Sequence, residues 1–376
     1  MSLPPLTLTR QLLEQGIEEG LHLGGQVYVS RGAGGGGTLE SRDLAVGESA
    51  PGVAMAPDTL NIWLSSTKPV TAAALGLLWQ EGEIDLDDPA ARYVPAFAAH
   101  GKDRITLRHL LTHTSGIRML NLGWPEADWD EVIGTICARR PEPRWPFGEK
   151  AGYHMASSWF VLGAVIVAVA GQPFSRVVRE RVLEPCGMLD SWIGMPRERF
   201  EAYGERIGRM FGTENGARLP RKWHEPRSML RPSPGGNGYG PIRELGRFYE
   251  MLLRRGVTAQ GERLLEPPTV EAMTTPSRVG LLDHTFKQKL DWGLGFIVDS
   301  KHYGAASVAY GYGPHASRRT FGHSGYRSST AFADPERDLA VALVVNGQPD
   351  DGAHGRRFDA LTAAIYQDLG LAGEPI

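Results

Sequence analysis

Apolar residues recur at the three- and four-residue spacing of helices in several segments of the chain. Most of these segments lie in its middle part, where loops that contain proline and glycine separate one from the next. The pattern predicts helices over residues 9–20, 68–81, 106–113, 128–139, 156–170, 174–183, 242–254 and 356–371.

Towards both ends of the chain the pattern changes to that of β-strands. The segment "GGQVYVSRGAGGGG" (24–37) reads as a strand that runs into a glycine-rich turn, and "LAVGE" (44–48) reads as the returning strand. Near the other end, Asp334-Pro335-Glu336-Arg337 is typical of a turn between two strands. The strands predicted in this second region cover residues 292–299, 327–335 and 338–347.

Strands at both ends with helices between them predict an α/β (α+β) fold. We expect one antiparallel sheet built from both ends of the chain and covered by the terminal helices. The sandwich domain would comprise residues 1–64 and 256–376, and residues 65–255 would form an inserted, mainly helical lobe. The active site is expected in the cleft between these two parts.

Composition narrows the range of partners. The 376 residues are 41% hydrophobic and 22% charged, with a formal net charge of −3, so neither a nucleic acid nor a membrane is expected as a partner. The apolar stretch 159–171 is too short to span a bilayer and predicts a buried helix. The first residues lack the pattern of a signal peptide. We expect a cytoplasmic protein with free thiols at Cys137 and Cys186; the oligomeric state stays open.

A glycine run near the N-terminus matches the residue spacing of a nucleotide-binding pattern but not its expected secondary structure. Gly32, Gly34 and Gly37 satisfy G-x-G-x-x-G. The residues that follow predict a returning strand instead of the helix that a dinucleotide site requires. We therefore expect a hairpin tip here and no dinucleotide cofactor.

The segment "LSSTKPVTAAALGLLWQEG" (64–82) places a lysine at the mouth of an apolar helix. Ser65 and Lys68 form S-x-x-K, and residues i and i+3 share one helix face. A lysine kept out of water has a lowered pKa and can relay a proton from the serine hydroxyl. The alternative is structural: Ser65 caps the helix and the charge of Lys68 reaches solvent.

Two further segments favour catalysis. In "KAGYHMASSWFVLG" (150–163), Tyr153 precedes an apolar helix at a loop-to-helix junction. In "FGHSGYRSSTAFADPERDLAVALVVNG" (321–347), His323, Ser324 and Gly325 lie beside a predicted strand and hairpin. A glycine beside such a strand lets the backbone approach a ligand closely.

With these segments in place, the chain resembles the serine β-lactamase and penicillin-binding-protein-like superfamily, on the branch of class C β-lactamases and family VIII carboxylesterases. The matching segments, which also include "ITLRHLLTHTSGI", occur in the family's order between about residue 20 and residue 370. The resemblance implies that Ser65 is the nucleophile that becomes acylated. It also implies that Lys68 and Tyr153 form the base pair that activates it.

The same resemblance implies an oxyanion hole and a substrate contact. The backbone N–H groups of Ser65 and Tyr326 would bind the oxyanion, and His323, Ser324 and Gly325 would contact the substrate. No cofactor and no metal is implied. His109 and His113 share a helix face, but no Glu stands in the H-E-x-x-H position and the sequence shows no obvious third ligand for zinc. Ser324, in "GHSG", does not complete G-x-S-x-G, because Tyr326 fills the last position.

Two motifs depart from the pattern of penicillin-recognising members. Tyr153-His154-Met155 stands where Tyr-x-Asn is usual, with Ser157 as a candidate substitute for the amide, and His323-Ser324-Gly325 stands where Lys-Thr-Gly is usual. Both changes remove contacts that suit a β-lactam. They favour a carboxylesterase acting on small, short-chain esters. The alternatives are a β-lactamase, a D-aminopeptidase or an acyltransferase with the same machinery, and a catalytically silent binding homologue.

The aromatic residues and the glycine-rich turn of the middle region leave two interpretations open. Trp124 and Trp129 lie in a long loop that often forms the substrate wall in the family that the chain resembles. They could line an acyl pocket or simply pack at the surface or in the core, and Trp292 is expected in the core. A structural role is favoured for the turn. The residues concerned are Trp124, Trp129, Trp223, Tyr239 and Trp292, and Gly235-Gly236-Asn237.

Overall fold

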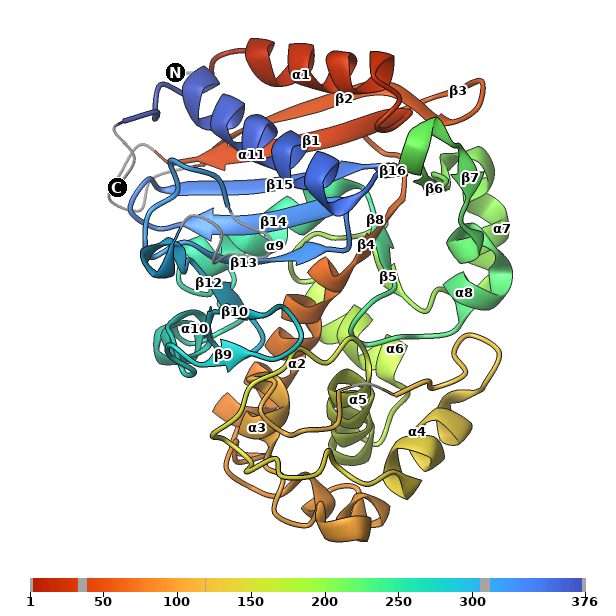
Figure 1. Cartoon of the computed structure of the whole chain (residues 1–376), viewed down its shortest axis with the longest axis vertical. Helices are drawn as coiled ribbons and strands as arrows, with labels where there is room; N and C mark the ends of the chain where they lie inside the picture. Colours follow the sequence, from red (N-terminus) through yellow and green to blue (C-terminus); the bar gives the residue numbers. More distant parts are fainter. Residues whose placement is uncertain (1–2, 33–38, 119, 305–311, 374–376) are drawn as a thin grey trace.

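A large antiparallel sheet built from both ends of the chain organises the structure (Figure 1). The computed structural model describes residues 3–32, 39–118, 120–304 and 312–373. The eight strands run in the order β11-β12-β13-β14-β15-β1-β2-β3. Their bounds are β1 Gly24–Arg31, β2 Glu40–Ala50, β3 Val53–Ala54, β11 Asp291–Trp292, β12 Ile297–Val298, β13 Phe321–Gly325, β14 Ser329–Asp334 and β15 Leu339–Val345.

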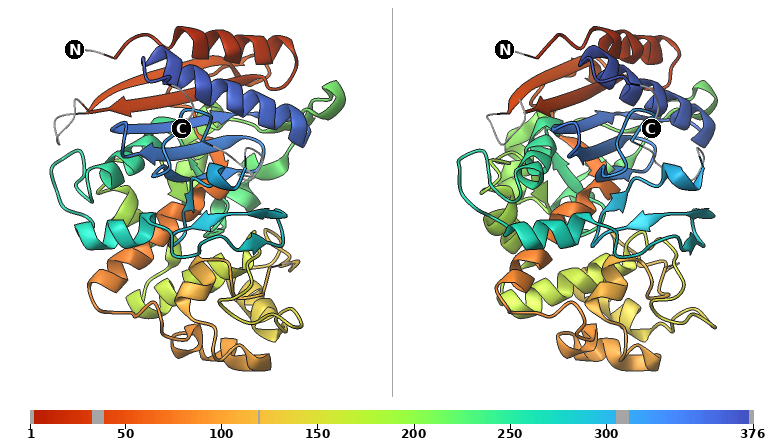
Figure 2. Two further views of the ribbon diagram at one scale, coloured as in Figure 1. Left: turned by 60° about the vertical axis from the view of Figure 1, so that its left-hand side comes forward. Right: turned by 90° about the vertical axis from the view of Figure 1, so that its left-hand side faces the viewer.

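Helices cover both faces of this sheet, which explains why its central strands are buried throughout. Every residue of β14 and β15 is buried. The terminal helices α1 (Thr7–Glu18) and α11 (Asp351–Asp368) lie together over one face (Figure 2). On the other face, α9 (Ile242–Leu253) packs against β1, β14 and β15. The predicted fold class, a sheet from both ends covered by the terminal helices, is confirmed.

Asp368 joins the two terminal helices by capping the start of α1. Its carboxylate accepts the backbone N–H groups of Leu8 at 3.0 Å and Thr9 at 2.9 Å, and the Thr9 hydroxyl at 2.8 Å. The first amides of a helix lack partners within the helix and favour negative charge. The first helix is therefore completed by a residue near the other end of the chain.

The helices of the middle region lie on the far side of α9 from the terminal helices (Figure 1). They are α2 Lys68–Gln80, α3 Leu107–Leu111, α4 Trp129–Ala138, α5 Ser157–Ala170 and α6 Phe174–Val178. Among the described residues, no single helix is both long and apolar enough to cross a membrane; α5 and Phe174–Leu183 pass that test only together, across an 82° bend. Cys137 and Cys186 are buried free thiols.

Three small sheets join the remaining segments. One has the order β4-β8-β5, a second β16-β6-β7 and a third β10-β9. Their strands are β4 Asn61–Leu64, β5 Trp192–Ile193, β6 Phe211–Gly212, β7 Leu219–Pro220, β8 Gly238–Gly240, β9 Leu282–Asp283, β10 Gln288–Lys289 and β16 Gly347–Gln348. The other helices are α7 Arg197–Tyr203, α8 Pro226–Leu230 and α10 Pro267–Thr274, with short helical turns η1 Ser65–Thr67, η2 Ala90–Arg92, η3 Pro95–Gly101, η4 Arg179–Leu183, η5 Gly204–Arg206, η6 Glu214–Gly216, η7 Lys222–His224 and η8 Lys301–Tyr303.

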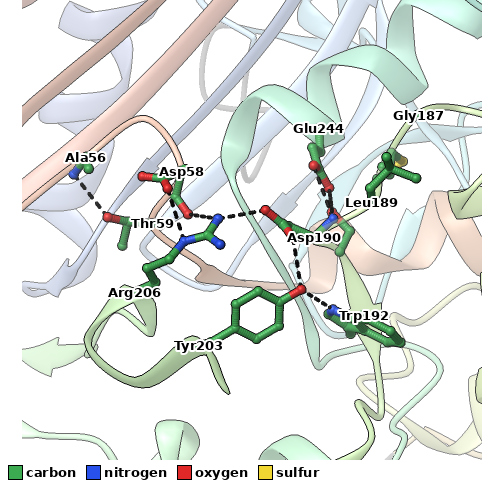
Figure 3. A network of polar contacts seen from close by, with 12 residues as sticks. Ala56, Asp58, Thr59, Gly187, Leu189, Asp190, Trp192, Tyr203, Arg206 and Glu244 are labelled. Atoms are coloured by element: carbon green, nitrogen blue, oxygen red, sulfur yellow. Dashed lines mark hydrogen bonds and ion pairs between the residues drawn. The ribbon is translucent and has the colours of Figure 1, made fainter. Parts of the chain in front are cut away.

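An ionic network fixes the segment that leads into β4 (Figure 3). The Arg206 guanidinium pairs with Asp58 at 3.1 Å and with Asp190 at 2.6 Å. Asp190 also accepts the Tyr203 hydroxyl at 3.0 Å, and that hydroxyl accepts the indole N–H of Trp192 at 3.0 Å. The network ties the approach to β4 to β5, the other edge of the same small sheet.

Several predicted elements differ from the structure. Residues 292–299 form the hairpin β11–β12 instead of one strand, because Gly295 turns the backbone with φ +88°. The helix predicted over 174–183 changes from α to π hydrogen bonding at Arg179. The glycine-run hairpin tip falls on residues 33–38, outside the described residues. Because α9 packs on the large sheet yet falls within 65–255, the division into two domains stays a prediction.

Candidate active site

Ser65 lies at a sharp turn between a strand and a helix. Strand β4 ends at Leu64, whose φ of +50° is unfavourable for a residue with a side chain, and costs on the order of 1–3 kcal/mol. The chain then enters η1 and α2, where Pro69 occupies a first-turn position that suits proline. The Thr67 hydroxyl closes the turn by donating to the Leu64 carbonyl at 2.6 Å. This turn leaves Ser65 partly exposed at its tip.

Lys68 points inward and is fully buried. Its Nζ donates to Ser65 Oγ at 2.9 Å, to the Met155 carbonyl at 3.0 Å and to the Gly235 carbonyl at 2.7 Å. Burial lowers the pKa of Lys68 well below its ordinary value, because an ammonium loses its hydration there. A lowered pKa favours the neutral form of the amine. Its nitrogen then has a free lone pair and can accept a proton from a neighbouring hydroxyl.

Tyr153 contacts the same oxygen from the loop that precedes α5. Its hydroxyl donates to Ser65 Oγ at 2.7 Å, although the two residues are far apart in sequence. Its ring is packed between His113 and Phe286, each with a centroid distance of 4.8 Å. Trp292 lies at 6.0 Å, in the core as expected. The structure thus brings the three predicted catalytic residues together around one oxygen atom.

Strand β13 carries the third motif directly beside the turn at Ser65. The Ser66 hydroxyl donates to the His323 carbonyl at 3.0 Å. A side chain at Gly325 would overlap the Trp63 carbonyl and approach Leu64 Cβ to 3.0 Å, so only glycine fits this contact. The close approach of Gly325 to Trp63 and Leu64 brings the segments that continue into Tyr326 and Ser65 side by side. Tyr326 and Ser65 supply the two backbone N–H groups predicted to bind the oxyanion. Their use as an oxyanion hole stays a prediction.

The side chains of this motif are neutral and mostly buried. His323 is 1% exposed, and burial lowers the pKa of its imidazole to about 3, with Lys68 adding to the effect. The Ser324 hydroxyl lies 2.8 Å from that of Thr330, and Ser324 is buried. Tyr326 is exposed, and Gln348 donates to its carbonyl at 2.7 Å. Because the Ser324 hydroxyl is buried against Thr330, the structure gives no support to Ser324 as a nucleophile.

The second motif presents a backbone carbonyl and an apolar side chain. Met155 is 58% exposed, and its carbonyl accepts Lys68 Nζ. The suggestion that Ser157 replaces the missing amide is wrong, because Ser157 is buried and its hydroxyl donates to the Ile117 carbonyl. The exposed surface at this position is therefore apolar.

The two histidines of the third predicted helix have separate structural contacts. His109 Nδ1 accepts the Thr106 N–H at 3.2 Å, which caps α3. His113 is buried against the Tyr153 ring, and its Nδ1 accepts the His154 N–H at 2.9 Å. Across the part of the chain that the structure describes, no group of three or more His, Cys, Asp or Glu residues is arranged to hold a metal ion.

The glycine-rich turn and the aromatic residues fall mostly into packing roles. A side chain at Gly235 would collide with Trp159, while the Gly235 carbonyl accepts Lys68. Trp129 stacks on Phe174 at 5.8 Å. Tyr239 is a buried core residue, whereas Trp124 and Trp223 are partly buried against core clusters.

Sequence reasoning missed a buried ion pair beside Tyr153. Asp283 and Arg278 lie 3.2 Å apart with side chains 0% and 2% exposed. The Asp283 carboxylate accepts the Tyr153 N–H at 3.1 Å. No motif or periodicity around these residues points to the pair, since "RVGLLDHTF" (278–286) reads as an ordinary loop.

The chain is similar to known proteins over nearly its whole length. A family model described as Beta-lactamase matches residues 9–364. Esterase EstB of Burkholderia gladioli is 26% identical over 386 residues, covering 94% of this chain and 93% of EstB.

Two solved structures share the whole fold. A penicillin-binding-protein homologue from Caulobacter crescentus has a TM-score of 0.79 at 27% identity, covering 98% of this chain and 99% of the homologue. A family VIII carboxylesterase has a TM-score of 0.77 at 26% identity, again covering 98% and 99%. With nearly its full length matched by the family model and by these structures, the chain belongs to the beta-lactamase family.

Proposed function

We propose that this protein is a serine hydrolase that hydrolyses small carboxylic esters through an acyl-Ser65 intermediate. One observation carries the proposal: a single partly exposed hydroxyl, Ser65 Oγ, lies 2.9 Å from the Lys68 amine and 2.7 Å from the Tyr153 phenol. Two groups able to exchange protons with one accessible hydroxyl form the constellation of an activated nucleophile.

The proposed reaction uses side chains and backbone amides of this chain. Lys68 and Tyr153 together take the Ser65 proton while Oγ attacks the ester carbonyl. The N–H groups of Ser65 and Tyr326 stabilise the oxyanion. The carbon–oxygen bond to the alcohol then breaks, and the alcohol leaves with the proton held by the base pair. Water repeats these steps on the acyl-enzyme, releasing the acid and restoring the Ser65 hydroxyl.

The surroundings of Ser65 support an ester over a β-lactam. A β-lactam carries a carboxylate, which a fixed cation would bind, whereas His323 is neutral because burial lowers its pKa to about 3. Met155 offers an exposed apolar side chain where an amide would contact an acylamino group. The similarity to EstB and to a family VIII carboxylesterase supports the same choice.

The proposal is tested with the purified protein and Ser65→Ala on two kinds of substrate. One series consists of p-nitrophenyl esters of increasing acyl length, and the other substrate is a chromogenic cephalosporin. We expect ester turnover that disappears in Ser65→Ala, with little cephalosporin hydrolysis. Cephalosporin turnover equal to ester turnover would replace the esterase by a β-lactamase. Turnover of neither substrate, with no labelling of Ser65 by a fluorophosphonate probe, would favour a silent binding homologue.

A further inference from the structure

The carboxylate of Asp283 accepts hydrogen bonds from the backbone at and near Tyr153. Its Oδ1 accepts three N–H groups, from Tyr153 at 3.1 Å, Thr285 at 2.9 Å and Phe286 at 3.1 Å. Two of these donors belong to the β9–β10 hairpin, and the third belongs to the residue whose hydroxyl meets Ser65 Oγ. One oxygen atom thus fixes Tyr153 relative to a separate segment of the chain.

The ion pair extends this attachment to the helical region. Arg278 pairs with Asp283 Oδ2 at 3.2 Å and donates to the Thr112 carbonyl at 3.0 Å. Thr112 is followed by His113, whose ring lies 4.8 Å from the Tyr153 ring. The pair therefore holds both the backbone of Tyr153 and a neighbour of its ring.

The hairpin also clamps Tyr153 directly. The Thr285 hydroxyl donates to the Tyr153 carbonyl at 3.2 Å, and the His284 N–H donates to the Ala151 carbonyl at 2.8 Å. Phe286 packs on the Tyr153 ring at 4.8 Å. The contacts act on the backbone and on the ring of Tyr153, so they determine where its hydroxyl lies.

A buried ion pair is a poor way to gain stability, because desolvating two charges costs about as much as their attraction returns. The presence of this ion pair beside Tyr153 therefore calls for a reason other than stability. We propose that Asp283 is a positioning residue for Tyr153, holding the phenol at hydrogen-bond distance from Ser65 Oγ. This inference rests on the proposed function, since it assumes that Tyr153 exchanges protons with Ser65.

Two matched double variants test it. Arg278→Met with Asp283→Ala removes both charges and the oxygen that accepts the Tyr153 N–H. Arg278→Met with Asp283→Asn removes both charges but keeps an acceptor oxygen at that place. Both variants avoid an unpaired buried charge. They therefore differ chiefly in whether residue 283 offers an oxygen that accepts the Tyr153 N–H.

The readout is kcat and KM per folded molecule on an ethyl ester and on the matching p-nitrophenyl ester. An alkyl alcohol is a basic leaving group that needs a well-placed proton donor, whereas p-nitrophenol needs little help. A misplacement of about 1 Å costs on the order of 100-fold. We expect the alanine variant to lose ~100-fold in kcat on the ethyl ester, less on the p-nitrophenyl ester, and little in KM. The asparagine variant should stay within a few-fold of wild type.

Equal activity of the two variants, or an equal loss on both esters, would overturn the positioning role. If the alanine variant does not fold, Asp283→Glu keeps the charge but displaces the carboxylate by one methylene, and the same preferential loss on the ethyl ester is expected. Ser65→Ala is measured in parallel. Activity that survives Ser65→Ala refutes the proposed function itself, whereas an inactive Ser65→Ala with indistinguishable double variants refutes only the role of Asp283.

Discussion

The buried amine of Lys68 makes a prediction about stability that does not depend on catalysis. Burial lowers its pKa well below the ordinary 10.5. Between these two pKa values the unfolded chain binds one more proton than the folded chain. Stability therefore rises with pH across that window, and the contribution of this group is lost as pH falls. A difference of one proton gives a slope of about 1.4 kcal/mol per pH unit.

Lys68→Met isolates this contribution, because methionine fills a similar space without an ionisable group. We expect the free energy of unfolding of wild type minus that of the variant to increase with pH by up to ~1.4 kcal/mol per unit. Groups outside the site cancel in this difference. The neighbouring imidazoles do not enter, since burial holds the pKa of His154 and of His323 at about 3 and lowers that of His113 well below its ordinary value.

The measurement is urea unfolding, followed by tryptophan fluorescence, at intervals from pH 7 to pH 10. The chain has nine tryptophans to report the transition. Lys222→Met, at an exposed lysine, serves as the control and should give a difference independent of pH. If the curve for Lys68→Met ran parallel to that of wild type throughout, Lys68 would be protonated in the folded protein. The argument for a proton-accepting amine would then be refuted.

Three further changes test the geometry of the site. Tyr153→Phe keeps the ring packing and should lower kcat on esters by ~10²–10⁴-fold, with a change in unfolding free energy of only about 1 kcal/mol; a kcat within threefold of wild type would exclude Tyr153 as base. Gly325→Ala forces a methyl group against the Trp63 carbonyl and should destabilise the protein by ~1–3 kcal/mol in thermal unfolding, whereas an unchanged melting temperature would contradict that contact. Met155→Asn, at an exposed position, should raise cephalosporin turnover relative to ester turnover by up to about tenfold, the worth of one good hydrogen bond; an unchanged ratio would mean that this position does not select the substrate.

Regular periodicity explains what could be predicted from the sequence. The alternation and apolar runs near both ends predicted strands that pair across the whole chain. The spacing of apolar residues predicted α2 and α5 to within one residue, whereas α11 (Asp351–Asp368) begins five residues before the predicted helix at 356–371 and ends three residues before its end. The S-x-x-K spacing placed Lys68 beside Ser65 because a single helical turn fixes that distance. Bringing Tyr153 to the same oxygen required the family resemblance, since nothing local links the two residues.

Features set by tertiary contacts escaped prediction. Asp283 sits in a strand of two residues, too short to give any periodic signal, and its contact with the Tyr153 amide joins residues that are 130 positions apart in the sequence. Ser157 looked available in the sequence, yet the helix start turns its hydroxyl to the Ile117 carbonyl. The hairpin at Gly295 replaced a predicted strand because one left-handed residue reverses the chain.

The pairing of β1 with β15 sets the order in which the enzyme can be completed during synthesis. Gly25 pairs with Val345 and Arg31 with Leu339, so the first strand waits for partners encoded about 300 residues later. At ~5–20 residues per second, that wait lasts on the order of 15–60 s. Throughout it the apolar faces of β1 and β2 lack their cover, and α1 lacks the Asp368 cap. A ribosome that stalls before residue 339 therefore leaves a product in which β1 has no β15 to pair with.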